Sequence, residues 1–457
     1  MLDLLIKNGI VVTPQGLIRG GVGVQSGRIA SIITEELPSQ EVVDASGQYV
    51  LPGVIDPHVH MGIGATHGQG EVTFQSDFST ESVSAAVGGV TTIITSATFG
   101  RSAESMKSRM KRARAIAQQS SIVDFKIFPF FVTKSHVEEI PQLMKEGFTN
   151  FKFPLAYVGQ EKWRQPGMGV DWSFLYRGLE LVAQSGPPAL AMIHAEEPTI
   201  FDLLEARARS QGKSGLAAFA DARPSACEAM HIFAAGLLAG ELGAPLYVVH
   251  TSAKESVDII QYLQAQGIKV IGETCPHYLF LTRDAEAGPL AKVNPPIRQE
   301  ADSRRLWQGL KDGTITTIGT DHCPNQRAAK EGEFWEATSG FGSIGATLAL
   351  LVSEGVNKSR ISWELLAKIT SENVARAFGI YPQKGVLSPG SDADIVIVDP
   401  HQEWTITADA LHSICDYSIY EGMKVKGKVV KTYVRGQLVA ENGHPVKSPP
   451  WGDYVYC

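Results

Sequence analysis

Cysteine is scarce in this sequence and irregularly spaced. The 457 residues include five cysteines, an odd number, at scattered positions: Cys227, Cys275, Cys323, Cys415 and Cys457. Secreted disulfide frameworks carry paired cysteines at regular spacings, whereas cytoplasmic thiols stay reduced. The pattern argues against a disulfide-stapled scaffold and predicts a cytoplasmic protein with reduced thiols.

The sequence has no excess of positive charge. Its 41 Lys and Arg residues against 48 Asp and Glu residues give a formal net charge of -7, and no basic stripe or aromatic-basic repeat occurs. Nucleic acids and anionic membranes select basic surfaces, so this composition argues against both as partners.

Long apolar runs are missing as well. The most apolar region, residues 231–249, is interrupted by Glu241 and Pro245, and the first nine residues contain Asp3 and Lys7. A transmembrane helix needs about 20 apolar residues. We therefore expect neither a membrane span nor a signal peptide, and the start of the chain is typical of a β-strand.

Short strand patterns separated by turn signals occupy both ends of the chain. Asn8-Gly9 and Arg435-Gly436 mark hairpin turns within residues 1–53 and 384–444. Residues 1–53 are too few to bury a core alone. We predict that the two segments pair as one small β-sandwich domain, and that residues 445–457 form an extended tail on the protein or on a neighbouring subunit.

Between residues 54 and 383, apolar strands alternate with helix-like segments, which is the signature of a parallel α/β sheet. The predicted strands are 53–59, 90–95, 125–131, 149–155, 189–194, 246–250, 269–273 and 316–320. Eight such strands favour a (β/α)8 barrel of the TIM type, with its active site at the carboxyl ends of the strands. A doubly wound open sheet is the alternative, but no Gly-rich phosphate loop follows the first strand.

The first strand of this region ends in two histidines, His58 and His60. Side chains at i and i+2 of a strand point to the same face, so both imidazoles can reach one metal ion. Such a pair is weak evidence when it stands alone.

Four more side chains able to bind metal lie at or near the ends of other predicted strands: Lys152, His194, His250 and Asp321. Each alone is more simply explained as a packed, hydrogen-bonded or snorkelling residue. The carboxyl ends of barrel strands meet at one rim. Potential ligands at the ends of five different strands are hard to explain by packing alone, and together they predict a metal site.

Longer motifs follow one another in a fixed order along essentially the whole chain. They are PGVIDPHVH (52–60), GGVTT (88–92), Lys152 with Tyr157, HAE (194–196), VHTS (249–252), ETCPHYL (273–279), NPPIR (294–298) and TDHCP (320–324). In this order and spacing the sequence resembles the cyclic amidohydrolases, the group of hydantoinase, dihydropyrimidinase, allantoinase and dihydroorotase.

The resemblance implies two divalent metal ions, most simply Zn2+, with Mn2+ or Co2+ as alternatives, bridged by a carboxylated Lys152. One ion would be bound by His58, His60 and Asp321, and the other by His194 and His250. Four neutral imidazoles and one aspartate would leave two dications with a net charge of about +3. A carbamate formed from CO2 and a bridging hydroxide lower this charge to about +1.

The resemblance also implies a reaction, the hydrolytic ring opening of a cyclic amide by metal-bound hydroxide. Asp321 would serve as general base and acid, and Tyr157 would donate a hydrogen bond to the developing oxyanion. Asn294, Ser339 and Gly340 would bind the amide edge of the ring. His277, His322 and Glu196 could support the site from outside.

Within this group, the sequence favours a hydantoin or a dihydropyrimidine as substrate. Related dihydroorotases carry Arg where this chain has Gly62, and allantoinases tend to carry Asn there. Residues 76–89 look most like hydantoinases and dihydropyrimidinases. The loops 61–73, which includes His67, and 155–168 would shape the pocket.

Two alternatives remain open: an allantoinase or another ureide or cyclic imide hydrolase, and a non-catalytic scaffold on the same fold. Scaffold relatives typically lack the metal ligands, all six of which are present here. The resemblance further suggests a homotetramer or homodimer.

Overall fold

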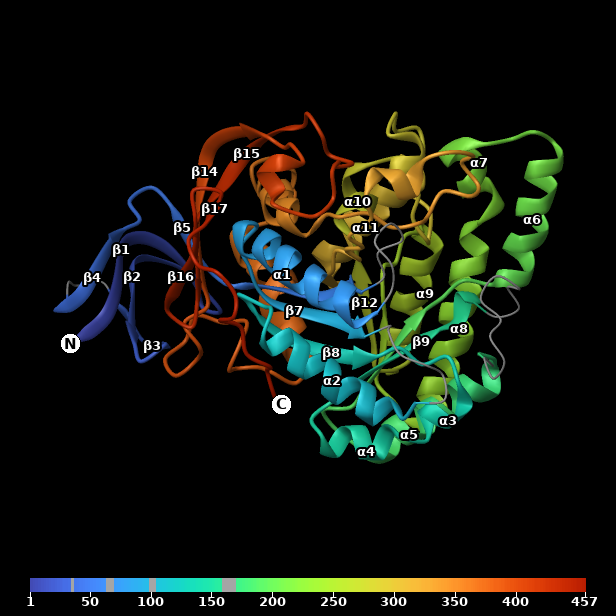
Figure 1. The fold of residues 1–457 in the computed structure, drawn as a ribbon, viewed down its shortest axis with the longest axis horizontal. Helices are drawn as coiled ribbons and strands as arrows, with labels where there is room; N and C mark the ends of the chain where they lie inside the picture. The colour runs from blue at the N-terminus through green and yellow to red at the C-terminus, as the bar shows by residue number, and fades with distance from the viewer. Residues whose placement is uncertain (34–36, 63–69, 98–103, 158–169) are drawn as a thin grey trace.

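Parallel strands form a barrel in the middle of the chain in the computed structural model, which describes residues 1–33, 37–62, 70–97, 104–157 and 170–457 (Figure 1). Three strands pair in the order β6-β7-β8 and five in the order β13-β12-β11-β10-β9. Parallel bridges from Phe130 to Lys152 and from Val59 to His322 join these two sheets at both edges. The strands are β6 (Val54–Met61), β7 (Val90–Ala97), β8 (Asp124–Pro129), β9 (Asn150–Pro154), β10 (Leu190–His194), β11 (Leu246–Val248), β12 (Val270–Thr274) and β13 (Ile315–Ile318).

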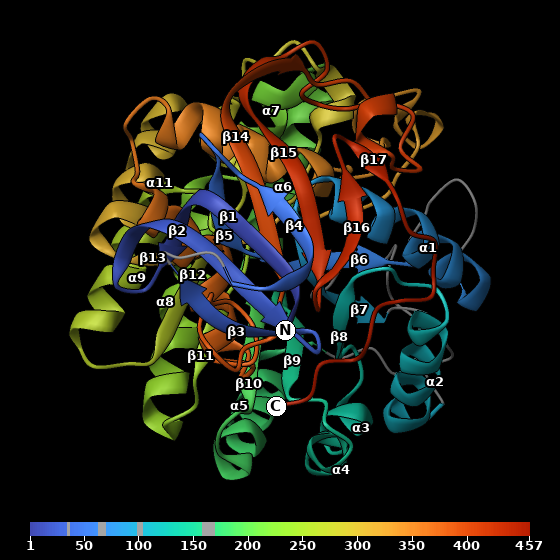
Figure 2. The same cartoon turned by 90° about the vertical axis from the view of Figure 1, so that its left-hand side faces the viewer.

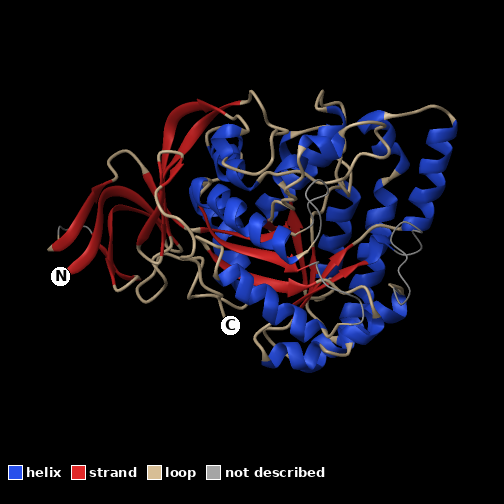
Figure 3. Cartoon of the chain, in the orientation of Figure 1, coloured by secondary structure: helices blue, strands red, loops and turns tan. Residues whose placement is uncertain are grey.

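Helices surround the barrel, as the colouring by secondary structure shows (Figure 3). Every crossover between consecutive barrel strands carries at least one of them, and the predicted (β/α)8 barrel is confirmed. The helices are α1 (Glu71–Val87), α2 (Met106–Gln118), α3 (Lys134–Val137), α4 (Ile140–Lys145), α5 (Trp172–Ser185), α6 (Pro198–Ser210), α7 (Gly215–Ala222), α8 (Ser225–Leu242), α9 (Lys254–Ala265), α10 (Pro276–Phe280), α11 (Glu300–Asp312), α12 (Thr347–Leu350), α13 (Trp363–Ala367) and α14 (Asn373–Ala377).

Local sequence signals account for the strands and for several helix ends. All eight residues of β7 are buried, as expected for a parallel strand covered on both faces. Asp171 caps α5, because its Oδ1 accepts a 2.7 Å hydrogen bond from the N–H of Phe174. Gln299 and Asp302 form a capping box at the start of α11, and Gly313, with φ 83°, ends that helix.

Strands from both ends of the chain meet in one nine-stranded sheet beside the barrel (Figure 2). At the junction, β5 pairs antiparallel with β14, so that Val50 lies opposite Ile397. Side chains from both ends, among them Val22, Ile395 and Tyr433, enclose a small core. The predicted sandwich is therefore built from a single hydrogen-bonded sheet. Its strands are β1 (Leu2–Thr13), β2 (Gly16–Gln25), β3 (Arg28–Ile33), β4 (Ser39–Asp44), β5 (Tyr49–Pro52), β14 (Ile395–Thr405), β15 (Lys424–Val434), β16 (Gln437–Glu441) and β17 (His444–Pro445).

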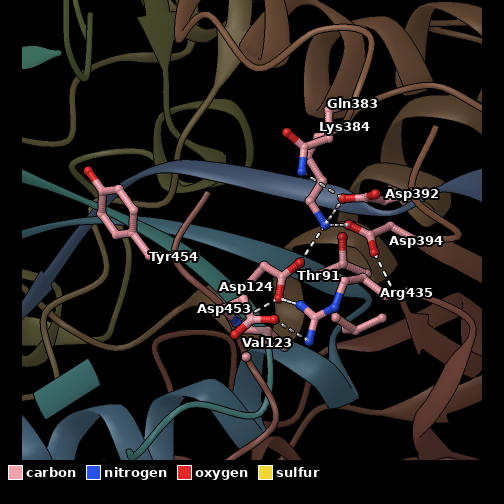
Figure 4. Close-up of polar contacts among 12 residues, drawn as sticks. Thr91, Val123, Asp124, Gln383, Lys384, Asp392, Asp394, Arg435, Asp453 and Tyr454 are labelled. Atoms are coloured by element: carbon pink, nitrogen blue, oxygen red, sulfur yellow. Dashed lines mark hydrogen bonds and ion pairs between the residues drawn. The ribbon is translucent and has the colours of Figure 1, made fainter. Parts of the chain in front are cut away.

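A buried ion network fastens this sheet to the barrel (Figure 4). The Nζ of Lys384 lies 2.8 Å from Asp394 and 3.1 Å from Asp392, and it also pairs with Asp124 at the start of β8. Arg435 pairs with the same Asp124. A buried ammonium needs compensating carboxylates, so each partner depends on the others.

The last residues of the chain extend the contact with the barrel. The N–H of Phe125 donates to the carbonyl of Asp453 at 3.0 Å, and the N–H of Val455 donates to the carbonyl of Phe125 at 2.9 Å. The tail thus lies against β8 as a short parallel bridge. Within the described ranges, no helix has both the length and the apolar character needed to cross a membrane.

Candidate metal and active site

The barrel strands bring the predicted ligands to one rim. His58 and His60 lie near the carboxyl end of β6, and His194 is the last residue of β10. Lys152 lies within β9, in register with Met192 of β10. The remaining ligands, His250 and Asp321, lie two residues after β11 and three residues after β13.

His250 and Asp321 adopt a backbone conformation that non-glycine residues seldom take. Their φ angles are 42° and 51°, in the left-handed region. The N–H of His250 is held by a 2.9 Å hydrogen bond to Glu273. Strain of this kind persists where the surroundings fix it, and it gathers at functional sites.

One group of ligands consists of His58, His60 and Asp321. Their ligand atoms all lie within 4.8 Å of one another. Oδ1 of Asp321 is 3.0 Å from Nε2 of His60 and 3.5 Å from Nε2 of His58, and the two imidazole nitrogens are 3.2 Å apart. Two imidazoles and a carboxylate that converge on one point form a donor set for a divalent metal ion.

The second group consists of His194 and His250. Nδ1 of His194 lies 3.0 Å from Nε2 of His250. Lys152 joins the two groups, because its Nζ lies 3.2 Å from Nε2 of His58, whose ring centroid is 5.3 Å from that of His250. All six predicted ligands therefore converge.

The outer imidazole nitrogens of His58, His60 and His194 are engaged by other side chains, whereas Nδ1 of His250 has no hydrogen-bond partner among the described residues. Nδ1 of His58 lies 3.1 Å from Glu273, and Nε2 of His194 lies 2.9 Å from Glu196. Nδ1 of His60 lies 3.0 Å from Oγ of Ser96. When a carboxylate holds the proton on the outer nitrogen, the inner nitrogen presents a lone pair to the centre. The donor set therefore fits metal ions.

Burial favours the neutral, metal-binding form of these imidazoles. It lowers the pKa of His58 and His250 well below the usual value, with the nearby Lys152 acting in the same direction on both. Burial also lowers the pKa of His194, although Glu196 opposes the shift. Neutral imidazole is the form that binds a metal ion.

Lys152 is adapted to lose its proton. Burial lowers the pKa of its amine to about 8, against the opposing charges of Asp321 and Glu273. A neutral amine is the form that adds to CO2, and the lowered pKa makes this form more abundant near neutral pH than it is for an exposed lysine.

A second layer of contacts fixes the backbone around Asp321. Nδ1 of His322 accepts hydrogen bonds from the N–H groups of Ser343 and Ile344, at 3.0 and 3.3 Å. Its other nitrogen lies 3.0 Å from the buried Glu81 of α1. The carbonyl of His322 accepts the N–H of His60 at 2.8 Å, so this residue links two ligand-bearing strands.

Another set of charged residues holds the imidazole ring of His194. Glu196, which accepts from His194, also pairs with Arg223 at 3.0 Å. Burial raises the pKa of Glu196, but the charge of Arg223 and the hydrogen bond from His194 outweigh it and lower that pKa to about 2. The ionised carboxylate therefore orients the His194 ring.

The predicted substrate-binding residues lie on two connected segments. The N–H of Gly340 donates to the carbonyl of Lys292 at 2.9 Å, and Asn325 donates to the carbonyls of Ser339 and Gly340 at 3.3 and 3.2 Å. The Oδ1 of Asn294 is buried and has no hydrogen-bond partner among the described residues. It is therefore available to a ligand, whereas the N–H of Gly340 is already used.

Other predicted pocket residues lie outside what the structure describes. Tyr157 ends a short 3-10 turn (Leu155–Tyr157) after β9, but its side chain is not among the described groups. Most of loops 61–73 and 155–168, including His67, also falls outside the described ranges.

Two buried lysines hold the segment that carries Ser339. Nζ of Lys292 donates to the carbonyls of Trp335 and Ala337, at 2.7 and 2.8 Å. Nζ of Lys330 donates to the carbonyl of Thr338 at 2.6 Å. Both Nζ atoms donate to backbone carbonyls, so the segment is braced by backbone contacts.

Lys330 gives a testable dependence of stability on pH. Burial lowers its pKa from 10.5 to about 7. Between these pH values the unfolded chain keeps a proton that the folded chain has released, so stability rises with pH. The free energy of unfolding of the wild type, relative to Lys330→Met, should increase by on the order of 3 kcal/mol from pH 7 to pH 9.5.

Denaturant unfolding at both pH values measures this difference. The control is Lys358→Met, which removes an exposed lysine and should follow the wild type at both values. Parallel pH profiles for the wild type and Lys330→Met would contradict the assignment.

Comparisons with known proteins agree with this geometry. Residues 195–439 match the model of the amidohydrolase family. The chain is 33% identical to D-hydantoinase of Ralstonia pickettii over 465 aligned positions, covering 99% of this chain and 98% of that one. The structure superposes on dihydropyrimidinase from Brevibacillus agri with a TM-score of 0.91 and 32% identity, covering 100% and 98% of the two chains. For L-hydantoinase (dihydropyrimidinase) from Arthrobacter aurescens the TM-score is 0.92, with 32% identity and 100% of both chains covered.

The barrel, the cluster of predicted ligands at its rim and these matches place the chain in the amidohydrolase family, as the sequence motifs predicted. Within that family it is a cyclic amide hydrolase of the hydantoinase and dihydropyrimidinase type. Members of the family use divalent metal ions, and the group formed by His58, His60 and Asp321 is consistent with this use.

Proposed function

We propose that this enzyme opens the ring of a hydantoin or a dihydropyrimidine by hydrolysing an amide bond at a dinuclear metal centre. The observation that supports the proposal is the convergence of all six predicted ligands at one rim. The ions would be held by His58, His60 and Asp321 on one side, by His194 and His250 on the other, and by a carbamate on Lys152 between them. When bound, zinc, manganese or cobalt ions supply Lewis acidity and lower the pKa of water.

Lys152 would contribute a carboxylate that the sequence does not encode. Its neutral amine adds to CO2 and releases one proton, which leaves an anionic carbamate. The position of Nζ, 3.2 Å from Nε2 of His58, lets the new oxygens reach both groups of ligands. The burial that lowers the pKa of this amine therefore favours the modification.

Asp321 would move the proton in the reaction. Burial alone would raise its pKa, but the adjacent imidazoles of His58 and His60, the latter through a hydrogen bond, outweigh this effect and hold that pKa well below the usual value. The carboxylate is therefore ionised and able to accept a proton from the attacking water. It would return this proton to the nitrogen that leaves, which departs poorly as an anion.

Substrate recognition would fall to the segments around Asn294 and Ser339. The unpaired Oδ1 of Asn294 is a ready acceptor for a ring N–H. Tyr157 would donate its O–H to the oxygen on which charge develops. Relatives named both D- and L-hydantoinase match this chain at similar identity, so the fold itself admits either enantiomer.

A turnover panel tests the proposed substrate class. The enzyme, loaded with zinc, cobalt or manganese, would be assayed with dihydrouracil, both enantiomers of 5-substituted hydantoins, allantoin, dihydroorotate and a cyclic imide. We expect turnover of hydantoins or dihydrouracil and little of dihydroorotate, because the Arg that would pair with its carboxylate is replaced by Gly62.

Two outcomes would contradict the proposal. Activity confined to allantoin would make the protein an allantoinase. Failure to bind divalent metal in chelator-free preparations, together with inactivity after metal is added, would indicate a scaffold.

A further inference from the structure

The last cysteine of the sequence lies beside a buried lysine of the barrel. Nζ of Lys126, on β8, is 3.1 Å from Sγ of Cys457, although the two residues are 331 positions apart in the chain. All five cysteines lie in the described ranges, and Cys457 is exposed whereas the other four are buried. Exposure governs which thiols an oxidant in solution reaches, so Cys457 is the first of the five to meet one.

The thiol of Cys457 is seated among fixed groups of the barrel. Its Sγ lies 3.4 Å from Oγ1 of Thr149 and donates to the carbonyl of Phe378 at 3.3 Å. Thr149 directly precedes β9 and Phe378 directly follows α14, so these groups lie at the amino-terminal ends of the barrel strands. The metal ligands lie near the carboxyl ends. The pair of Lys126 and Cys457 is therefore separate from the catalytic rim.

Lys126 is buried without a carboxylate partner. Its side chain is 1% exposed, and Nζ donates to the carbonyl of Val455 at 3.3 Å and to the thiol. No Asp or Glu in the described part of the chain pairs with this amine, whereas the equally buried Lys384 pairs with three carboxylates. Burying an unpaired ammonium group is costly, and an apolar side chain would avoid that cost. Packing alone therefore does not explain a lysine at this position.

The tail that carries Cys457 is held by hydrogen bonds before it reaches the lysine. The N–H groups of Trp451 and Gly452 both donate to the carbonyl of Ser121 at 2.8 Å. The hydroxyl of Tyr454 donates to the carbonyl of Gly147 at 3.0 Å. With its backbone fixed, the tail brings sulfur and nitrogen together in advance, which favours a reaction between them.

We propose that a peroxide joins Cys457 to Lys126 by a covalent bond between Sγ and Nζ, which clasps the tail to β8. In the first step the sulfur takes one oxygen atom from hydrogen peroxide, the O–O bond breaks and water leaves, which gives a sulfenic acid. In the second step the lone pair of Nζ attacks Sγ, the S–O bond breaks, and the hydroxyl group leaves with a proton of the amine as water. The sulfur loses two electrons, and one peroxide is reduced to two waters.

The second step needs the neutral amine. Burial lowers the pKa of Lys126, although Cys457 opposes the shift. The neutral form is therefore more abundant than it is for an exposed lysine. The bond is also reversible, because dithiothreitol adds two hydrogens across it and forms its own disulfide, which restores the thiol and the amine.

Peptide mapping of the full-length protein tests the bond. After treatment with hydrogen peroxide and alkylation of free thiols, the peptide that contains Lys126 should be joined to the peptide that contains Cys457. The mass of this pair should equal the sum of the two peptides less two hydrogen atoms, and dithiothreitol should separate them. The pair should be absent from Cys457→Ser and from wild type oxidised in urea, where the contact is lost. Oxidation of Cys457 without a linked pair, a pair that carries an additional oxygen atom, or an equal yield in urea would overturn the proposal.

Thermal unfolding tests whether the bond acts as a clasp. A link between residues so far apart restricts the unfolded chain, so Tm of the peroxide-treated wild type should rise by several degrees and return after reduction. Lys126→Arg keeps a cation beside the thiol but removes the amine, and it should show neither the linked peptides nor the rise. Cys457→Ser, at an exposed residue, gives the same comparison if Lys126→Arg does not fold. An equal rise in Cys457→Ser, or a linked wild type with unchanged Tm, would overturn the clasp.

Discussion

Replacing Lys152 by alanine should abolish metal binding and reduce turnover by roughly four orders of magnitude or more. The side chain is 1% exposed and lies between the two groups of ligands. Without its carbamate, the two dications lose one of the anions that they would share, and their repulsion is less well compensated. Metal content, measured by elemental analysis after dialysis, and kcat with the best hydantoin or dihydropyrimidine would be compared with the wild type.

The chain offers a matched control in Lys126. This lysine is also 1% exposed and lies on β8, but its Nζ bonds to the carbonyl of Val455 at the other end of the barrel. Lys126→Met should lower stability and leave the metal content unchanged. Acetate or propionate should partly restore metal binding and turnover in Lys152→Ala, because a free carboxylate fits the space that the side chain leaves. A Lys152→Ala enzyme with two metals and wild-type turnover would refute the bridging role.

The barrel was predictable because its signal is local and repeated. Each buried parallel strand appears as a short apolar run, and each run ends at the rim. The helices were harder to predict. Helix α1 starts at Glu71, and no amphipathic pattern marks that start, because its first turns contain polar residues that the fold buries. Asp77 is one of these: its carboxylate accepts the N–H of Gly62 at 2.7 Å, which ties the helix to the end of β6.

Helices α6 and α7 could not be predicted from the sequence for a different reason. They lie in the crossover between β10 and β11, where one helix is enough to reverse the chain and α8 alone could do so. No rule of periodicity requires two more helices there. Their packing is long-range: Arg223, which follows α7, stacks on Phe201 of α6 at 3.8 Å from the ring centroid and reaches Glu196.

Among the residues that orient the ligands, some could be placed from the sequence and others could not. Glu273 is the last residue of the predicted strand 269–273 and the penultimate residue of β12, so its place near the rim was visible in the sequence. Its contact with His58, 215 residues away, was not. Arg223 has no signal at all, because an arginine after a short helix is usually solvated. The ligands follow from strand ends, whereas the supporting groups depend on the tertiary structure.

Replacing Asp321 by asparagine should lower kcat by about 10²- to 10⁴-fold, which is the usual contribution of a positioned proton carrier. The amide keeps an oxygen near His60 and His58, so some metal should remain bound. It cannot accept the proton of the attacking water. The loss should therefore appear mainly in kcat, with metal content measured in the same samples.

Asp56 provides the control for this substitution, since it is a buried carboxyl in the same region. Its oxygens accept the N–H of His58 at 3.2 Å and the N–H and O–H of Thr320 at 3.1 and 2.6 Å. An asparagine can keep both N–H bonds and donate its amide hydrogen to the Thr320 oxygen, so Asp56→Asn should stay within about tenfold of wild-type kcat. If Asp321→Asn turned over as fast as Asp56→Asn with full metal occupancy, Asp321 would be a ligand only, and the proton would have to travel through another group.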